Sequence, residues 1–504
     1  MLPTNFAGVL ASAAHARPGH DAVVAAEGAC TYARLAGRAA AFAGALADAG
    51  VAPGDRVAIF LPRGADAAAA FFGTLAHGAV AVFVNETLKA RQIRHILSHS
   101  GARAVLTDGE MAARLPEGPG GERLTVIDAD RLGDGGDLAP VARVGTDVAQ
   151  IIYTSGSTGL PKGVTLSHAN LWAGMQAVGE YLSISADDRI ASILPFSFDY
   201  GLNQLLCAVG AGATLVVERS PVPQRIVRTL RDQAVTVLPT VPPSWLQLLG
   251  VRSFEQEPIA SLRCMTNTGG LLPVEAVRRL RRAQPHAQLF LMYGLTEAFR
   301  SAYLDPAKVD AKPGSIGRAI PGAELLVLRE DGTPCGPGEV GELVHRGPTV
   351  ALGYWDDPEL TERVFRPNPC RPPGTPASER VVFSGDQVRL DEDGDLYFVG
   401  RRDRMIKTLG YRVSPDEVAD VLYASGEVAE AVVGAEPDDT RGNRIVAFVV
   451  LRPGGDLARL QAFCASELPR YMQPARIEVR DELARTHSGK YDVAATAASA
   501  RSGS

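Results

Sequence analysis

Tyr153-Thr-Ser-Gly-Ser-Thr-Gly-Leu-Pro-Lys-Gly-Val164 is a string rich in glycine and hydroxyl residues that follows directly on the strand-like stretch Val148-Ala-Gln-Ile-Ile-Tyr153. Glycine lets backbone N–H groups approach a bound anion closely, hydroxyl groups donate hydrogen bonds, and Lys162 adds a positive charge. The string therefore predicts a loop that holds a polyphosphate, although a bare Ser-Thr-Gly tripeptide would more often be a flexible linker. It differs from the Walker pattern, because Gly163 stands where that pattern has Ser or Thr. The residues expected to contact the phosphates are Thr154, Ser155, Gly156, Ser157, Thr158, Gly159 and Lys162.

The composition is that of a soluble globular protein with several domains. The chain has 504 residues, of which 46% are hydrophobic and 21% charged. Its net charge of -6 comes from acidic and basic residues mixed along the chain, so we expect small-molecule or protein partners and neither nucleic acid nor a membrane surface. The six cysteines form no C-x-x-C pair, which argues against zinc and favours a reducing, cytoplasmic setting. No apolar run reaches the roughly 20 residues that span a bilayer.

Alternating helix-like and strand-like segments predict an α/β fold. The apolar run 56–61 lies between the alanine-rich stretches 31–49 and 63–76 and is typical of a buried strand. Further strand-like runs occur at 104–107, 190–194, 213–217 and 235–238. We therefore expect parallel sheets that are covered by helices.

The pattern changes twice after residue 310. Short β-type runs separated by Gly, Pro and Asp-Gly predict an antiparallel β subdomain over about 311–400. Ser414-Pro-Asp-Glu417 is typical of a helix start, with Ser414 as the N-cap and proline in the first helical position. The expected organisation is a large N-terminal domain over 1–402, a small C-terminal α+β domain over 403–492 and a disordered tail over 493–504.

Six further motifs follow the phosphate loop in order. They are Phe196-Ser-Phe-Asp-Tyr-Gly201, Tyr293-Gly-Leu-Thr-Glu297, Gly341-Glu-Leu-Val-His-Arg-Gly347, Ser384-Gly-Asp386, Gly400-Arg-Arg-Asp-Arg-Met-Ile-Lys-Thr-Leu-Gly-Tyr-Arg412 and Ser488-Gly-Lys490. Together with the loop they resemble, over nearly the whole chain, the adenylate-forming superfamily of acyl-CoA synthetases, nonribosomal-peptide adenylation domains and luciferases. The resemblance implies a mobile small domain and the ATP-dependent activation of a carboxylic acid as its acyl-AMP, with release of pyrophosphate.

The resemblance also implies roles for single residues in nucleotide and metal binding. Glu297 supplies a hard oxygen ligand for Mg²⁺, Tyr293 a flat face for adenine, and Asp386 an acceptor for the ribose hydroxyls. Lys490 offsets charge as the carboxylate attacks the α-phosphorus. The implied catalytic residues are Lys490, Thr296, Glu297 and Arg401, and the other implied nucleotide contacts are Gly269, Gly270, Met292, Tyr293, Gly294, Asp386 and Arg401. Outside these motifs, Ser-Gly-Asp is usually a turn and a lysine near the chain end is usually solvated.

The hinge and the thiol passage of the superfamily also have counterparts in this chain. Asp403 corresponds to the hinge, and Gly410 to a narrow passage for a pantetheine arm, where a side chain would block the way. Without the other motifs, the arginines around Asp403 would favour a solvated charged linker. The chain departs from the superfamily at Ala484, where proline is usual, and in lacking a basic residue soon after Asp492. The Ser-Gly-Lys-x-Asp core is intact, so Lys490 keeps its implied role.

The residues implied around the acid form a polar set that includes a cation. They are Phe198, Asp199, Tyr200, Asn203, Thr240, Thr266, Thr268, Met292, Arg300 and Ser301. Such a lining favours a small polar acid over a long fatty acid. Asp199 falls where amino-acid-activating domains pair an aspartate with the substrate ammonium, and an ordinary helix N-cap is the alternative. Arg300 is expected either to meet a substrate carboxylate or to neutralise Asp199.

Two thiol acceptors are compatible with these motifs. The Phe196–Gly201 motif is similar to free-standing amino acid–carrier protein ligases and to exosortase-associated AMP-forming acyl-CoA ligases. The first resemblance implies transfer to the phosphopantetheine of a carrier protein, which is expected to act in trans because no carrier-like segment follows Lys490. The second implies a coenzyme A thioester of a small non-amino acid. A luciferase-type oxygenase and a catalytically silent nucleotide-binding regulator are more distant alternatives, and the filled catalytic positions argue against the regulator.

Overall fold

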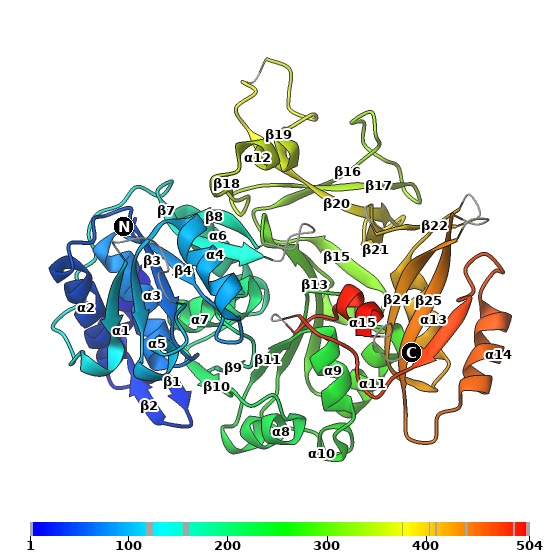
Figure 1. Ribbon diagram of the computed structural model, residues 1–504, viewed down its shortest axis with the longest axis horizontal. Helices are drawn as coiled ribbons and strands as arrows, with labels where there is room; N and C mark the ends of the chain where they lie inside the picture. Colours follow the sequence, from blue (N-terminus) through cyan, green and yellow to red (C-terminus); the bar gives the residue numbers. More distant parts are fainter. Residues whose placement is uncertain are drawn as a thin grey trace.

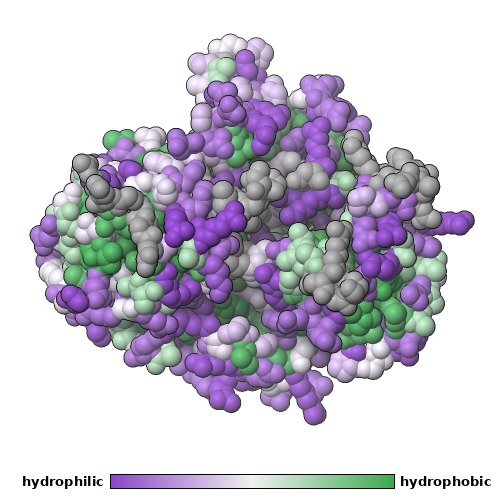
Figure 2. All heavy atoms as spheres, viewed as in Figure 1, coloured by the Kyte–Doolittle hydropathy of each residue, from purple (hydrophilic) through white to green (hydrophobic). Residues whose placement is uncertain are grey.

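Two large β-sheets and a smaller C-terminal domain organise the chain (Figure 1). The computed structural model describes residues 4–116, 124–154, 161–374, 376–402, 404–408, 411–438, 442–486 and 489–499. Helices and parallel strands alternate through the first three hundred residues, which confirms the predicted α/β class. Among the helices of these described ranges, none is long and apolar enough to cross a membrane. Figure 2 shows hydrophilic side chains over most of one face, with apolar residues in separate groups.

The seven-stranded sheet contains, near one edge, the two strands that flank the predicted phosphate loop. Its order is β18-β8-β7-β4-β3-β5-β6. The bounds are β3 (Arg56–Phe60), β4 (Val80–Phe83), β5 (Ala102–Thr107), β6 (Thr125–Asp128), β7 (Val148–Thr154), β8 (Lys162–Ser167) and β18 (Gly353–Tyr354). The strands β3 to β7 run parallel, whereas β8 and β18 are antiparallel to their neighbours. The central strands β3 and β4 are almost entirely apolar because both faces of the sheet are buried.

Helices of alanine-rich sequence cover this first sheet and join it to the second. Alanine and glycine on facing sides let α2 (Tyr32–Asp48) and α3 (Ala65–His77) pack closely, and both helices contribute to one large apolar core. The helices α6 (His168–Tyr181) and α7 (Asp199–Ala211) belong to the same core. The Phe196–Gly201 motif overlaps the start of α7, and the buried side chains of Phe196 and Tyr200 hold the first turn of this helix in the core.

The larger sheet has a mainly parallel half, built from residues 21–295, and an antiparallel half, built from residues 299–401. Its order is β16-β17-β20-β21-β15-β14-β13-β12-β11-β9-β10-β1-β2. The parallel half comprises β1 (Asp21–Ala25), β10 (Thr214–Val217), β9 (Arg189–Ser192), β11 (Val237–Thr240), β12 (Cys264–Asn267) and β13 (Gln288–Leu295), with β2 (Gly28–Thr31) at the edge. The helices α8 (Pro223–Asp232), α9 (Pro242–Leu249) and α11 (Val274–Ala283) build a second apolar core against it. Polar residues at the carboxyl ends of these strands therefore converge at one edge.

The antiparallel half contains the strands of the predicted β subdomain. They are β14 (Phe299–Tyr303), β15 (Ser315–Ala319), β16 (Glu324–Leu328), β17 (Val340–Arg346), β20 (Arg380–Leu390) and β21 (Leu396–Arg401), with β19 (Phe365–Pro367) paired to β20. They continue the larger sheet through the pairing of β13 with β14, so the β subdomain shares its hydrogen-bond network with the parallel strands.

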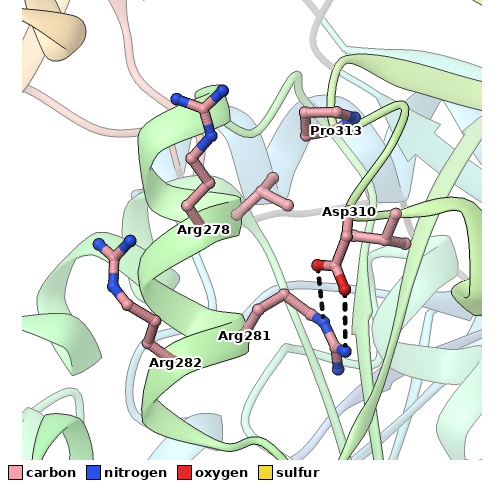
Figure 3. Close-up of a pocket in the computed structure, with 7 residues that line it drawn as sticks. Arg278, Arg281, Arg282, Asp310 and Pro313 are labelled. Carbon is pink, nitrogen blue, oxygen red and sulfur yellow. Dashed lines mark hydrogen bonds and ion pairs between the residues drawn. The ribbon is translucent and has the colours of Figure 1, made fainter.

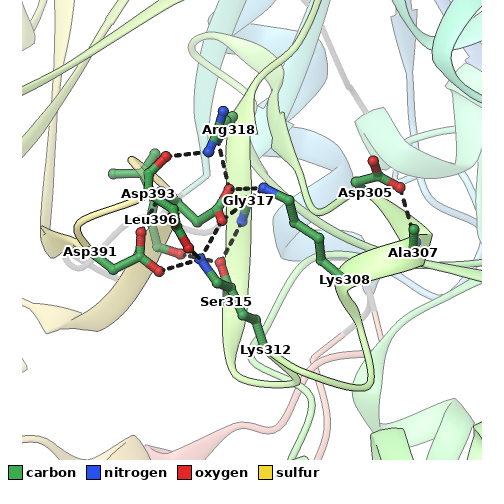
Figure 4. A network of polar contacts seen from close by, with 11 residues as sticks. Asp305, Ala307, Lys308, Lys312, Ser315, Gly317, Arg318, Asp391, Asp393 and Leu396 are labelled. Atoms are coloured by element: carbon green, nitrogen blue, oxygen red, sulfur yellow. Dashed lines mark hydrogen bonds and ion pairs between the residues drawn. The ribbon is translucent and has the colours of Figure 1, made fainter.

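A network of ion pairs ties the turn after β20 to the segment before β15 (Figure 4). Asp395 is 1% exposed and is held by Lys312 at 2.6 Å, Lys308 at 3.0 Å and Arg318 at 2.8 Å. Burial alone would raise the pKa of Asp395, but the hydrogen bonds from these three cations lower it to about 2. The Lys312 ammonium lies within 2.7 Å of an oxygen of Asp391 and of Asp393 as well. The carboxylate cluster is thus satisfied by lysine and stabilises the sheet.

The small domain has a separate core. Its elements are β22 (Ile406–Thr408), β23 (Tyr411–Val413), α13 (Pro415–Ala424), β24 (Val428–Asp438), β25 (Gly442–Leu451), α14 (Leu457–Glu467) and β26 (Arg476–Val479). The Ser414 hydroxyl accepts a hydrogen bond from the Glu417 N–H at 3.4 Å, which confirms the predicted helix start. Leu246 of α9 packs against this core, and the Val274 N–H donates to Asp420 at 3.1 Å. These contacts fix the small domain against the large one.

The expectation of a disordered tail from residue 493 is wrong for its first seven residues. They form the helix α15 (Val493–Ser499). Asp492 accepts a hydrogen bond from the Ala495 N–H at 2.9 Å, and Val493 and Ala497 pack on apolar side chains of β24 and β25. Small residues give no visible periodicity, yet alanine has the highest helix propensity and this short helix is held by tertiary contacts.

Acid is expected to destabilise the fold through His168, which is fully buried at the start of α6. Its Nδ1 accepts a hydrogen bond from the Phe6 N–H at 3.1 Å, and burial lowers its pKa to about 4. In the unfolded chain the ring binds a proton near pH 6.5, so the unfolded state holds more protons between pH 6.5 and 4 and stability falls as pH falls. This residue should contribute about 1.4 kcal/mol of lost unfolding free energy per pH unit. Urea unfolding from pH 7 to 4.5 should show a shallower pH slope for His168→Gln than for the native chain, and equal slopes would contradict this.

Candidate active site

The two ends of the predicted phosphate loop are paired across a β-hairpin. Thr154 ends β7 and lies opposite Lys162, which begins β8. Ser155, Gly156, Ser157, Thr158 and Gly159 lie outside the described residues. The Thr154 hydroxyl is buried and has no hydrogen-bond partner among the described residues. An acceptor supplied by a ligand would therefore satisfy it.

Lys162 lies beside Glu297 and Tyr354. The Lys162 ammonium is 3.4 Å from Glu297 Oε1 and 3.0 Å from the Tyr354 hydroxyl, which itself donates to Glu297 Oε1 at 2.5 Å. Burial raises the pKa of Tyr354 far above its usual range, and the charge of Glu297 adds to this. Sequence reasoning missed Tyr354, because Gly353-Tyr354 is too short a strand to carry a signal of its own.

The carboxylate of Glu297 fits the expected Mg²⁺. Both known partners of this side chain approach Oε1, and no donor among the described residues reaches Oε2. Mg²⁺ is usually held by one or two carboxylates together with phosphate oxygens. Glu297 therefore offers one free hard oxygen next to Lys162, at the edge where the phosphate loop begins.

Asp386 is held by two residues of the expected nucleotide set. Its carboxylate accepts hydrogen bonds from the Tyr293 hydroxyl and from Arg401 Nε, the latter at 2.7 Å. Tyr293 stacks on His345 with ring centroids 5.8 Å apart, and burial followed by the charge of Asp386 raises its pKa. The motif 341–347 was recognised in the sequence, but the contact of its His345 with Tyr293 was not. Gly294 lies in β13 next to Tyr293, and Thr296 is the first residue after this strand.

Lys490 reaches from the small domain to the large one. Its backbone is fixed by Thr486, whose N–H donates to the Lys490 carbonyl at 2.7 Å. The Lys490 ammonium is 5.2 Å from the centroid of the Phe198 ring. Gly269, which has φ 80°, leaves room for this side chain, because a Cβ there would lie 3.2 Å from Lys490 Cε. Burial lowers the pKa of Lys490, and the negative charge of Asp199 opposes this shift. Gly270 follows, beside Pro242.

Asp199 is the first residue of α7 and is 6% exposed. The N-cap residue is Phe198, and no side chain caps this helix, so the alternative that Asp199 is an ordinary N-cap is wrong. Asp199 forms no ion pair with a cation among the described residues, Lys490 and Arg300 included. This buried carboxylate acts on the pKa of Lys490 without pairing with it.

The remaining residues of the expected acid set lie around α7. The Tyr200 hydroxyl bonds to the carbonyl and hydroxyl of Thr266 at 2.8 and 2.5 Å. Met292 Sδ accepts from Tyr181 at 2.9 Å, and the Ser301 hydroxyl donates to Ala298. Four side chains keep buried polar atoms without a partner in the described structure. They are Asn203, Thr240, Thr268 and Arg300.

Arg300 does not neutralise Asp199. Its guanidinium lies over the rings of Tyr200 and Phe299, at 4.5 and 5.1 Å, and forms no ion pair within the described part of the chain. The hinge candidate Asp403 and the passage candidate Gly410 lie outside the described residues. Both remain predictions.

A surface pocket on α11 takes no part in this group (Figure 3). It has a volume of about 340 Å³ and is lined by Val277, Arg278, Arg281, Arg282, Val309, Asp310 and Pro313. Arg281 is paired with Asp310 at 3.2 Å. No residue expected to bind ATP or the acid lines it, so the chemistry is assigned to the edge between the two sheets and the small domain.

Comparison with known families agrees with this arrangement. Residues 10–355 match the AMP-binding enzyme family, and residues 417–490 match the AMP-binding enzyme C-terminal domain. The chain belongs to the AMP-binding enzyme family. The resemblance to adenylate-forming enzymes is thereby confirmed, and the chain is an adenylate-forming ligase.

Related AMP-binding enzymes include both free-standing and multimodular proteins. Novobiocin biosynthesis protein H of Streptomyces niveus is 33% identical, with 94% of this chain and 79% of that protein covered. The L-proline–[L-prolyl-carrier protein] ligase of Pseudomonas fluorescens is 31% identical, with 94% and 95% covered. Tyrocidine synthase 2 of Brevibacillus parabrevis is 32% identical over 94% of this chain, which spans only 13% of that synthase.

Solved structures of AMP-binding enzymes share the whole fold. The anthranilate CoA ligase AuaEII in complex with anthranoyl-AMP has a TM-score of 0.87 and 25% identity, with 99% of this chain and 96% of that chain covered. The o-succinylbenzoate CoA synthetase of Bacillus subtilis with its acyl-adenylate has a TM-score of 0.83 and 27% identity, with 96% of each chain covered. The same synthetase is also known with ATP and a magnesium ion.

Proposed function

We propose that this enzyme activates a small or polar amino acid with ATP and Mg²⁺ as its aminoacyl-AMP, and passes the aminoacyl group to the phosphopantetheine thiol of a separate carrier protein. The observation that carries the amino-acid assignment is Asp199, a buried carboxylate that pairs with no cation among the described residues and whose charge acts on the pKa of Lys490. A substrate ammonium would complete an ion pair there and repay the cost of burying the carboxylate.

The first half-reaction follows from the charges around this point. A carboxylate oxygen of the acid attacks the α-phosphorus of ATP, a new P–O bond forms, and the bond to the bridging oxygen breaks as pyrophosphate leaves. The Lys490 ammonium offsets the charge that develops between the acid and the α-phosphate. Lys162 and the Thr154 hydroxyl hold the outer phosphates, and Asp386 accepts from the ribose hydroxyls. When bound at Glu297, Mg²⁺ supplies positive charge to the phosphate oxygens.

The choice of a carrier protein as acceptor is supported by a relative that this chain covers almost completely. The prolyl-carrier protein ligase matches this chain over 95% of its own length. A coenzyme A thioester of a small non-amino acid is the second candidate, supported by the TM-scores of 0.87 and 0.83 to two CoA ligases. In either case the thiol sulfur attacks the acyl carbonyl, AMP leaves, and the thiol proton passes to solvent.

Exchange of labelled pyrophosphate into ATP tests the amino-acid assignment. Each amino acid is compared with the matching acid that lacks the amino group, in the native enzyme and in Asp199→Asn. We expect Asp199→Asn to lower exchange with the amino acid by about 100-fold or more, because its ammonium loses a buried charged partner, and exchange with the des-amino acid by less than about 10-fold. Asp199 is replaced by an isosteric amide, so packing is kept.

Two results would change the proposal. If Asp199→Asn lowers exchange equally with the amino acid and with the des-amino acid, Asp199 does not bind an ammonium group. That result would favour the second candidate function, a coenzyme A ligase of a small non-amino acid. A second stage offers a phosphopantetheinylated carrier protein or coenzyme A to the loaded enzyme, and faster AMP release with coenzyme A would overturn the carrier as acceptor.

A further inference from the structure

Arg300 is a buried cation whose charge is unmet by the described structure. The residue is 1% exposed, and neither its Nε nor its Nη2 has a hydrogen-bond partner in the part of the chain that the structure describes. Its near neighbours are the rings of Tyr200 and Phe299, together with Tyr181 and the thiol of Cys207, on whose pKa values its charge acts. None of these groups is an anion at neutral pH. Burial raises the pKa of Cys207 to about 12 in spite of Arg300, so the thiol stays neutral.

A buried guanidinium without an anionic partner destabilises the ligand-free protein. Contact with aromatic faces compensates part of the lost hydration of a guanidinium, but the N–H groups in its plane still need acceptors. Arginine is buried in proteins where a planar, two-oxygen acceptor meets its fork of donors. The anion that Arg300 lacks is therefore expected from outside the chain.

The residues around Arg300 place the expected anion near the position of the substrate acid. Asp199, Asn203 and Cys207 follow one another at intervals of four residues, so they share one face of α7. The Lys490 ammonium lies 5.2 Å from the ring centroid of Phe198, and the Arg300 guanidinium lies 4.5 Å from that of Tyr200, so the two cations contact the residues on either side of Asp199. Asn203 Nδ2 is a further buried donor that reaches no oxygen acceptor among the described residues, and its hydrogen bond to the weakly accepting Cys207 thiol opposes the rise of that thiol's pKa.

We propose that the acid carries a second carboxylate, and that Arg300 binds it at the end of the substrate remote from the carboxylate that is activated. This inference rests on the proposed adenylation and narrows its substrate class to amino acids with an acidic side chain. The reacting carboxylate lies toward Lys490, the ammonium pairs with Asp199, and the side-chain carboxylate accepts hydrogen bonds from Arg300 and Asn203. A substrate with a neutral amide in this place would leave Arg300 unpaired, which is the condition under which enzymes discriminate most strongly.

Pyrophosphate exchange with matched pairs of amino acids tests this. Aspartate is compared with asparagine, and glutamate with glutamine, because each pair differs in charge and hardly in shape. The native enzyme should prefer the acid to its amide by about 100-fold or more, and Arg300→Met should bring that ratio close to one. Arg300→Lys should restore part of the preference, since it keeps the charge and loses the two-pronged geometry. Arg282→Met, an exposed arginine of α11, is the matched control and should leave the ratio unchanged.

Thermal unfolding distinguishes a binding role from a structural one. Removing a buried, unpaired charge should raise the melting temperature of ligand-free Arg300→Met, whereas a structural role would lower it and would lower exchange with every amino acid alike. A native enzyme that exchanges asparagine or glutamine, or an apolar amino acid, as well as the acidic ones would overturn the inference and leave the proposed amino-acid activation intact. If no amino acid and no des-amino acid supports exchange, the proposed adenylation itself fails.

Discussion

Replacing Lys490 by alanine is expected to lower ATP–pyrophosphate exchange by about 100- to 1,000-fold, the range found when one preorganised transition-state donor is removed. The side chain lies over Gly269 and the Phe198 ring, where the reacting carboxylate and the α-phosphate must meet. Its partly lost hydration makes the positive charge more effective there than in water. Because Lys162, Asp386 and Glu297 belong to the large domain, ATP binding should change by less than about 10-fold in the variant. Initial exchange rates measure the loss of adenylation, and equilibrium ATP titrations measure the change in ATP binding.

Two controls separate this chemistry from a folding defect. Lys89→Ala removes an exposed lysine at the start of α4 (Ala90–Ser100) and should leave exchange unchanged. Thioester formation from a supplied aminoacyl-AMP should also survive in Lys490→Ala, since no charge then forms at phosphorus. Native-like exchange in Lys490→Ala would remove the residue from the mechanism.

The local part of the fold could be predicted from sequence. The expected strands at 56–61 and 104–107 are β3 and β5, because short apolar runs between alanine-rich stretches have few other solutions in an α/β protein. The helix α15 could not, since its seven residues owe their shape to Asp492 and to contacts with β24 and β25. The continuation of the parallel sheet into the β subdomain depends on pairing between β13 and β14, which a motif search does not address.

The candidate site, too, could be predicted only in part from the sequence. The sequence motifs identify Lys162, Glu297, Asp386 and Lys490 separately. The structure shows that Glu297 lies beside Lys162. Tyr354, 57 residues from Glu297 along the chain, completes that contact and carries no motif strong enough to be noticed alone. Sequence left two roles open for Arg300. Only the geometry removes one of them, because the absence of an ion pair with Asp199 depends on where two buried side chains end.

Glu297→Gln is expected to raise the Mg²⁺ concentration for half-maximal exchange by about 100-fold or more and to lower the maximal rate. The amide keeps an oxygen that can accept from Tyr354, so the side chain should stay in place while the negative charge and the free Oε2 ligand are lost. Tyr354→Phe is the comparison, because it keeps the carboxylate and removes only the hydroxyl that holds Oε1. Groups that orient a metal ligand typically change metal affinity or activity by about 10- to 100-fold, less than the loss of the ligand itself.

The geometry predicts which of the two substitutions has the larger effect on the Mg²⁺ dependence. Glu297→Gln should shift the Mg²⁺ dependence of exchange further than Tyr354→Phe, and Lys162→Met should weaken ATP binding with a smaller shift in Mg²⁺ dependence. A larger shift for Tyr354→Phe than for Glu297→Gln would mean that Glu297 serves to hold the tyrosine and Lys162, and that the metal is bound elsewhere. Exchange rates measured over a range of Mg²⁺ at saturating ATP decide between a carboxylate that binds the ion and one that only organises the edge of the sheet.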